Sequence, residues 1–234
     1  MGPQSRALLQ KVSPGTDFSE AAFPFGSSKQ IEIGYAQVRA SRITYVGELG
    51  WELYISGEFA LHVYERLWEA GGEFGLSHAG MHAMNACRME KGYRHWGDDI
   101  SVEDTPLEAG LAFAVAWDKP VPFLGRDALL ERRALGAPKR RLLQFRLLDG
   151  ERLLYREEPI WINGRRAGSI TSGAYGHRVE ASLGMGYVQA GEPVTAAWVE
   201  AQRFEIEVGW ERCEAQAQLE AFYDPKLERV KAPR

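Results

Sequence analysis

The first 137 residues alternate between stretches with the apolar pattern of strands and stretches with the apolar pattern of helices. Residues 31–46 are rich in β-branched and aromatic side chains and predict a strand, and residues 51–55 predict a second one. The apolar run 111–117 predicts a further strand. Helical spacing of apolar positions predicts helices over 5–12, 58–70, 78–91 and 125–133.

The segment TPLE (105–108) has the composition of a helix start. Thr105 suits the N-cap, Pro106 suits the first helical position, and Glu108 closes a capping box. We therefore expect a helix to begin at this point.

From residue 138 to the end the pattern becomes strand-like. Strands are expected over 141–148, 159–171, 183–188, 193–199 and 203–210. Asn163-Gly164 lies between two strand-like stretches and predicts a two-residue hairpin. The chain therefore reads as an α+β fold with two domains, an α+β domain over 1–137 and an all-β domain over 138–234.

The connection GELG (47–50) joins the two predicted strands of the first domain. If it is a four-residue connection, Tyr45 lies opposite Glu52 on one face and Val46 lies opposite Trp51 on the other. A tyrosine ring beside a carboxylate suits a flat heterocycle with an amidine-like edge, because the carboxylate accepts two parallel N–H bonds. An exposed glutamate beside a structural tyrosine is the alternative, and spacing alone does not separate the two.

Composition excludes several classes of protein. The chain has 234 residues, is 45% hydrophobic and carries a net charge of −4, which argues for an ordinary globular protein and against a nucleic-acid partner. No apolar run is long enough for a membrane span, so no membrane partner is expected. The two cysteines form no CxxC motif, which indicates a reducing compartment, the cytoplasm, rather than a disulfide framework.

Two further motifs have competing interpretations. His78 and His82 have metal-ligand spacing, but no HExxH motif or acidic third ligand accompanies them, so we expect no metal site. In the loop 92–101, Asp98 or Asp99 is expected to accept hydrogen bonds from backbone amides, as aspartate commonly does in turns. The alternative is that this loop lines a ligand channel.

Several motifs in order resemble the glycine-cleavage T-protein (aminomethyltransferase) superfamily. They are YVGELGWELYI (45–55), HAGMHAMNACRMEKGYRHWGDDI (78–100), EDTPLEAGL (103–111), FLGRDALL (123–130), SGAYGHRVEASLGMGYV (172–188) and AFYDP (221–225). The resemblance covers nearly all of the chain and is greatest to the C-terminal, folate-binding region of dimethylglycine and sarcosine dehydrogenases.

The resemblance implies a folate-binding α+β domain over 1–137, lacking the family's first part, followed by a C-terminal β-barrel domain over 138–234. It implies tetrahydrofolate as cofactor, with Glu52 on the amidine edge of the pterin and Tyr45 lining the pocket. Trp51 and Arg88 are the other cofactor-binding residues that we expect. The implied reaction is transfer of a one-carbon unit to the reduced folate, in the cytoplasm or, in a eukaryote, the mitochondrial matrix.

The chain also departs from the family pattern. The family's aspartate near the folate nitrogen belongs to upstream sequence that this chain does not have, so no catalytic residue is assigned. Several transferases carry an arginine one turn before the RME motif, where this chain has Met84, although Arg88 of the motif is present. No GxGxxG follows an N-terminal strand, so FAD is expected only in a fused or partner domain.

Two functions follow as expectations. The first is a one-carbon transferase module attached to, or partnered with, a flavin-dependent dehydrogenase. The alternative is a non-catalytic module that binds folate or protein for regulation or assembly. In either case we expect an exposed apolar surface, and hence self-association or a partner.

Overall fold

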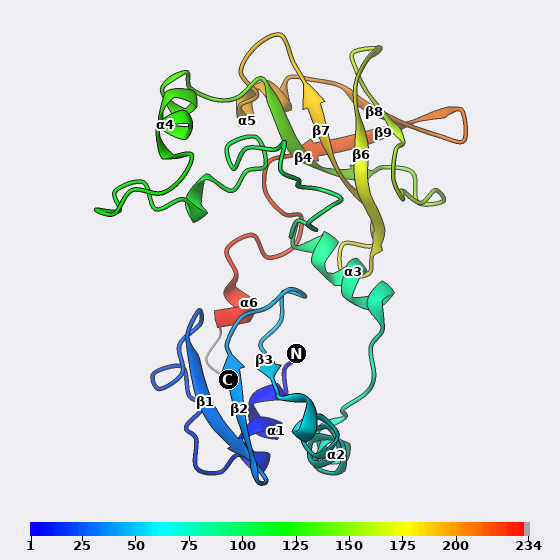
Figure 1. Cartoon of the computed structure of the whole chain (residues 1–234). Helices are drawn as coiled ribbons and strands as arrows, with labels where there is room; N and C mark the ends of the chain where they lie inside the picture. Colours follow the sequence, from blue (N-terminus) through cyan, green and yellow to red (C-terminus); the bar gives the residue numbers. More distant parts are fainter. Residues whose placement is uncertain (232–234) are drawn as a thin grey trace. The chain divides into compact units, whose positions relative to one another are not determined.

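The computed structural model describes residues 1–231 and divides the chain into two compact units. The first unit holds residues 1–87 together with residues 226–231, and the second holds Arg88–Pro225. Figure 1 shows the elements of both units, coloured along the sequence. No helix in the described part of the chain is long and apolar enough to cross a membrane.

The first unit combines a small antiparallel sheet with short helices. Its sheet has the order β1-β2-β3. The strands are β1 (Ser28–Ile33), β2 (Ala36–Ser41) and β3 (Glu52–Tyr54). The helices are α1 (Ser5–Val12), the 3₁₀ helix η1 (Gly57–Phe59), α2 (Ala60–Gly71), the 3₁₀ helix η2 (Gly72–Phe74) and α6 (Glu228–Lys231). Helix α3 (Met81–Glu90) begins in this unit and ends in the second.

Alternation along the strands gives this sheet one buried and one exposed face. The core of the unit includes Phe18, Phe23, Ile31, Ile33, Val38, Ala40, Trp51 and Val63. Between them on β1 and β2 lie exposed polar side chains, namely Gln30, Glu32, Gln37 and Arg39. The second face of the sheet is therefore polar and open within this unit.

The second unit is built on a closed antiparallel barrel with the strand order β4-β7-β6-β5-β8-β9. Its strands are β4 (Arg140–Leu147), β5 (Pro159–Ile162), β6 (Arg165–Gly176), β7 (Ala181–Gln189), β8 (Phe204–Val208) and β9 (Glu211–Gln218). The 3₁₀ helix η3 (Ala112–Ala114) and helix α4 (Arg126–Ala134) precede the barrel, and α5 (Ala196–Glu200) lies between β7 and β8 (Figure 1). The predicted α+β fold with an all-β C-terminal barrel is confirmed.

The barrel core is filled by apolar side chains from its strands, including Leu143, Phe145, Ile160, Ile170, Val188, Phe204 and Ile206. The predicted hairpin at Asn163-Gly164 is confirmed, because Ile162 pairs with Arg165 across it. Both turn residues have the positive φ angles of a type I′ turn, 48° at Asn163 and 78° at Gly164.

The elements differ from the expectations at several places. The predicted strand 31–46 is wrong because the chain turns at Gly34, whose φ is 61°, and makes β1 and β2 instead. The predicted strand 111–117 is wrong, since its centre is η3 and Phe113 is 84% exposed. The predicted strand 193–199 is wrong because Thr195 caps α5 by accepting from the backbone N–H of Trp198.

The fourth difference concerns the capping box at 105–108. Its hydrogen bonds form, with the Thr105 N–H donating to Glu108 Oε2 at 3.0 Å and the Glu108 N–H donating to Thr105 Oγ1 at 3.2 Å. The chain makes only a turn there, because Gly110 adopts a φ of 73° and ends it. Helices at 5–12, 58–70, 78–91 and 125–133 are confirmed within a few residues of their ends.

The predicted domain boundary at 137 stays a prediction. In the structure, residues 88–137 belong to the same compact unit as the barrel.

Glycines let the barrel strands and the loop before β5 approach closely. A Cβ added at Gly173 of β6 would overlap the backbone C and O atoms of Leu154, whereas a Cβ at Gly191 would meet nothing within 4 Å. We predict that Gly173→Ala lowers the free energy of unfolding by about 1–3 kcal/mol, the usual cost of overpacking. Gly191→Ala is the control and should change it by less than about 0.5 kcal/mol. Urea unfolding of both variants tests this, and equal stabilities would contradict it.

Candidate functional site

Glu52 begins β3 and is half-buried on the polar face of the three-stranded sheet. Tyr54 Oη donates to Glu52 Oε2 at 2.9 Å, so a carboxylate and an aromatic ring lie side by side on this face. The ring of Tyr54 is 55% exposed. The hydrogen bond to Glu52 raises the pKa of Tyr54 above its ordinary value, so the phenol stays protonated as the donor.

The neighbouring strand supplies polar groups to the same place. The register pairs Ser41 with Glu52 and Arg39 with Tyr54. Directly opposed residues share a face, so a hydroxyl and a guanidinium accompany the carboxylate and the ring. This arrangement can pack a flat ring against Tyr54 and can accept N–H groups on Glu52.

The predicted pairing of Tyr45 with Glu52 is wrong. Because β2 ends at Ser41, residues 42–51 form a long connection rather than a tight hairpin over 47–50. Thr44 organises it, since its Oγ1 accepts from the backbone N–H groups of Val46, Gly47 and Glu48 at 3.1–3.3 Å. Tyr45 lies half-buried in this connection, and its role as a pocket residue stays a prediction.

Trp51 lies on the opposite side of the chain from Glu52, in the core of the first unit. It is 6% exposed, and its ring packs edge-on against Phe18 and Phe23 with centroids 5.4 and 5.8 Å apart. Trp51 also lines an apolar cavity of about 550 Å³ together with Leu53 and Trp68. The structure thus explains Trp51 by packing, and its predicted contact with a cofactor is untested.

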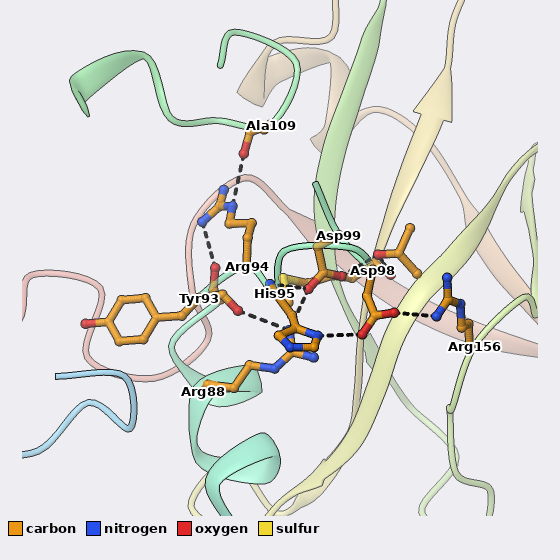
Figure 2. Close-up of polar contacts among 11 residues, drawn as sticks. Arg88, Tyr93, Arg94, His95, Asp98, Asp99, Ala109 and Arg156 are labelled. Atoms are coloured by element: carbon orange, nitrogen blue, oxygen red, sulfur yellow. Dashed lines mark hydrogen bonds and ion pairs between the residues drawn. The ribbon is translucent and has the colours of Figure 1, made fainter. Parts of the chain in front are cut away.

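Arg88 is held in a buried ion pair at the end of α3, as Figure 2 shows. Its side chain is 3% exposed, and Nη1 donates to Asp99 Oδ2 at 2.6 Å and to the carbonyl of Tyr93 at 3.1 Å. Asp99 also accepts from the His95 N–H at 2.8 Å and from Thr171 Oγ1 at 2.5 Å. The expectation that an aspartate of this loop accepts a backbone amide is confirmed for Asp99, and the pair joins α3, the loop 92–101 and β6.

His95 and Asp98 form a more exposed pair beside it. His95 Nδ1 lies 2.5 Å from Asp98 Oδ2, and Arg156 binds the other carboxylate oxygen (Figure 2). The hydrogen bond from His95, followed by the charge of Arg156, lowers the pKa of Asp98 against the effect of burial. An ionised carboxylate only accepts, so Nδ1 of the half-exposed imidazole donates in this hydrogen bond.

Arg94 has no ligand role that the structure supports. Its guanidinium donates to the carbonyls of Ala109 at 3.0 Å and Gly92 at 2.7 Å, and burial lowers its pKa. It therefore fixes the chain between the end of α3 and the turn before η3 (Figure 2).

The two histidines with metal-ligand spacing do not come together with acidic partners. Throughout residues 1–231, no group of three or more His, Cys, Asp or Glu side chains could hold a metal ion. His78 instead stacks on Trp68 with centroids 4.2 Å apart and bonds Tyr64 Oη at 2.9 Å.

Family models match both parts of the chain. The model of the GCVT N-terminal domain matches residues 1–119, and the model of the glycine cleavage T-protein C-terminal barrel domain matches residues 140–224. The chain belongs to the glycine cleavage T-protein family.

Two human relatives of this chain are much longer than the chain itself. It is 40% identical over 232 residues to human (Homo sapiens) "Sarcosine dehydrogenase, mitochondrial", covering 98% of this chain and 25% of the relative. It is 40% identical over 207 residues to human "Dimethylglycine dehydrogenase, mitochondrial", covering 88% of this chain and 23% of the relative. The chain thus spans about a quarter of the length of these two relatives.

A solved structure shares the fold. The crystal structure of glycine cleavage system aminomethyltransferase T from Bartonella henselae superposes with a TM-score of 0.78 at 24% identity, covering 99% of this chain and 59% of that chain. The sequence patterns did not predict Tyr54 as the partner of Glu52. The spacing of the two residues could have predicted it, because residues two apart on a strand share a face.

The buried ion pair yields a test of what supports the loop 92–101. Asp99→Asn removes the charge that faces Arg88 and should lower the free energy of unfolding by about 3–5 kcal/mol, as for other broken buried pairs. Glu69→Gln at the exposed Arg66–Glu69 pair is the control and should cost less than about 0.5 kcal/mol. Chemical denaturation measures both, and a loss below about 1 kcal/mol for Asp99→Asn would contradict this role.

Proposed function

We propose that this chain is a tetrahydrofolate-binding, one-carbon transferase module that serves glycine, sarcosine or dimethylglycine catabolism. The observation that carries the proposal is the Glu52–Tyr54 pair on the open polar face of the three-stranded sheet, in a chain of the T-protein family. The names of the two human dehydrogenases support sarcosine or dimethylglycine catabolism as the setting of the module.

The chemistry of the pair fits a pterin. A carboxylate accepts two parallel N–H bonds from an amidine-like edge, and each such charge-assisted bond is stronger than a neutral one. Tyr54 already fills one lone-pair site of Glu52 Oε2, which fixes the orientation of the carboxylate before a ligand arrives. When bound, tetrahydrofolate would supply the nitrogen that accepts the one-carbon unit.

The chain's own contribution is then orientation. Glu52 and Tyr54 would hold the flat ring, while Ser41 and Arg39 offer polar groups at its border. Trp51 would support the site from the core side through its packing, and no residue of the chain is assigned to a covalent step. Positioning of this kind contributes to catalysis by reducing the entropy lost on reaching the reactive geometry.

We also propose that FAD and amine oxidation belong to a further domain or partner, as in flavin-dependent dehydrogenases of sarcosine or dimethylglycine. The length of the two dehydrogenase relatives supports this, since about three quarters of each lies outside the match. The module would work where that dehydrogenase works, in the cytoplasm or in the mitochondrial matrix of a eukaryote.

A calorimetric titration with tetrahydrofolate tests the folate site. The wild-type chain should bind, and Glu52→Gln should weaken binding by about 1–3 kcal/mol, the range for losing a charge-assisted partner. Tyr54→Phe should weaken binding less, because the ring remains.

Glu32→Gln is the matched control for Glu52→Gln. Glu32 lies exposed on β1, and its carboxylate accepts from Gln37 Nε2 at 2.6 Å as that of Glu52 accepts from Tyr54. The control should bind as the wild type does. Equal weakening by both substitutions, or tight binding that survives Glu52→Gln, would contradict the assignment of Glu52.

A second candidate function, a non-catalytic protein-binding module, is favoured by the segment 111–137. No residue of this segment is buried. Its exposed apolar side chains include Phe113, Val121, Leu124, Leu130 and Leu135. A run of apolar side chains without a core of its own is typical of a surface that another polypeptide covers.

Sedimentation velocity tests this surface. We predict that the wild-type chain self-associates at micromolar concentration and binds a hydrophobic dye, and that Leu124→Glu with Phe113→Glu reduces both. The side chains are 101% and 84% exposed, so the substitutions should leave the fold intact. A compact monomer that binds no dye would rule out this docking surface and leave the folate site unaffected.

A further inference from the structure

The polar face of the three-stranded sheet carries one basic side chain beside the Glu52–Tyr54 pair. The register pairs Arg39 with Tyr54 on β3 and with Gln30 on β1, so these three side chains form a row across the face. The neighbouring row consists of Ser28, Ser41 and Glu52. Arg39 therefore places a guanidinium at the border of the candidate folate site.

The guanidinium of Arg39 is available to a ligand. It is exposed, and within residues 1–231 it makes no hydrogen bond or ion pair. Ser41 is already engaged, because its Oγ lies 3.0 Å from Ser28 Oγ. Lys29, the other basic residue of β1, β2 and β3, alternates to the core side, where its Nζ lies 5.1 Å from the centroid of the Phe23 ring. Arg39 is thus the one cation that these strands present on the polar face.

The register also places Arg39 within reach of a ring that Glu52 holds. Directly opposed side chains on one face have Cβ atoms about 4.5–5.5 Å apart, and diagonal neighbours lie about 7–8 Å apart, which long side chains span. Arg39 is directly opposite Tyr54 and diagonal to Glu52. A flat ring that packs on Tyr54 and bonds Glu52 therefore has the guanidinium of Arg39 at its edge.

The pyrimidine edge of a pterin carries donors and an acceptor side by side. Its N3–H and 2-amino groups donate, and these are the groups that the Glu52 carboxylate would accept. The 4-oxo oxygen, bonded to the carbon next to N3, accepts and needs a donor from the protein. An ionised carboxylate only accepts and a guanidinium only donates, so the two side chains match the two parts of this edge.

The negative charges of folate offer Arg39 a less suitable partner. The glutamate carboxylates lie at the opposite end of the molecule from the pyrimidine edge, beyond the second ring of the pterin and the p-aminobenzoyl group. A guanidinium held beside Tyr54 lies next to the edge that Glu52 binds, and hence far from that tail. The 4-oxo oxygen is the acceptor that this position favours.

We propose that Arg39 donates to the 4-oxo oxygen of the pterin and thereby selects 4-oxo pterins over 4-amino pterins. This inference rests on the proposed function, because it assumes that Glu52 binds the amidine edge. A 4-amino group would present N–H donors to a guanidinium that has no acceptor. A site built to hydrogen-bond one substituent rejects an analogue that cannot make the bond.

The test is a calorimetric comparison of tetrahydrofolate with tetrahydroaminopterin, the same molecule with an amino group in place of the 4-oxo oxygen. The wild-type chain should bind tetrahydrofolate about tenfold or more tightly, the range for a hydrogen bond to a charged group. Arg39→Met removes the donors and should weaken tetrahydrofolate by that factor. It should change the affinity for tetrahydroaminopterin less than about twofold, so the preference is lost. Arg39→Lys keeps a single charged donor and should give an intermediate preference.

Arg66→Met is the matched control. Arg66 is an exposed arginine on α2, where it pairs with Glu69, and it does not belong to the polar face of the sheet. The control should bind both ligands as the wild type does. Arg39→Met should keep the wild-type Tm, measured by circular dichroism, because its guanidinium holds no other group of the described chain.

The outcomes separate this inference from the proposed function. Tetrahydrofolate binding that depends on Glu52 but is unchanged in Arg39→Met would overturn the role of Arg39 alone. Equal weakening of both ligands would also overturn it, because the two ligands share their glutamate tail and differ only at position 4. Absence of tetrahydrofolate binding to the wild type, or binding that does not depend on Glu52, would overturn the proposed function together with this inference. A loss confined to tetrahydrofolate and absent from Arg66→Met would support the role of Arg39.

Discussion

The buried ion pair between Arg88 and Asp99 holds the second unit together around its first loop. One carboxylate binds the end of α3 through Arg88, the loop through the His95 amide, and strand β6 through Thr171. With every donor in place, two charges can be buried without the large cost of an unmatched ion. The same loop then presents His95 and Asp98 at the surface. The end of α3, the loop 92–101 and β6 are thus joined by one anchored carboxylate.

A different constraint positions the candidate folate site. Successive residues of a strand point to opposite faces. The adjacent residues Trp51 and Glu52 therefore lie on opposite sides, Trp51 in an aromatic core and Glu52 on an open polar face. Packing of Trp51 against Phe18 and Phe23 fixes the strand, and Tyr54 fixes the carboxylate. The glutamate that stands among aromatic residues in the sequence therefore has two kinds of aromatic neighbour: Trp51 packs in the core, and Tyr54 donates to the carboxylate.

Sequence patterns predicted four helices and one strong turn well. Helix α1 and the Asn163-Gly164 hairpin were confirmed, because helical spacing and the preference of that dipeptide for positive φ act locally. The pairing of Tyr45 with Glu52 failed because the tight hairpin was assumed and Thr44 instead folds residues 42–51 into a longer connection. The hydrogen bond from Thr171 to Asp99 joins segments far apart in the sequence, and no local pattern predicts such a contact.

A crystal structure of the chain with bound tetrahydrofolate tests most directly the proposal that Glu52 and Tyr54 form a folate-binding face. We predict that the pterin lies against the ring of Tyr54, with Glu52 accepting two N–H groups from its amidine edge. A pterin bound elsewhere, or bound on this sheet without a hydrogen bond to Glu52, would contradict it.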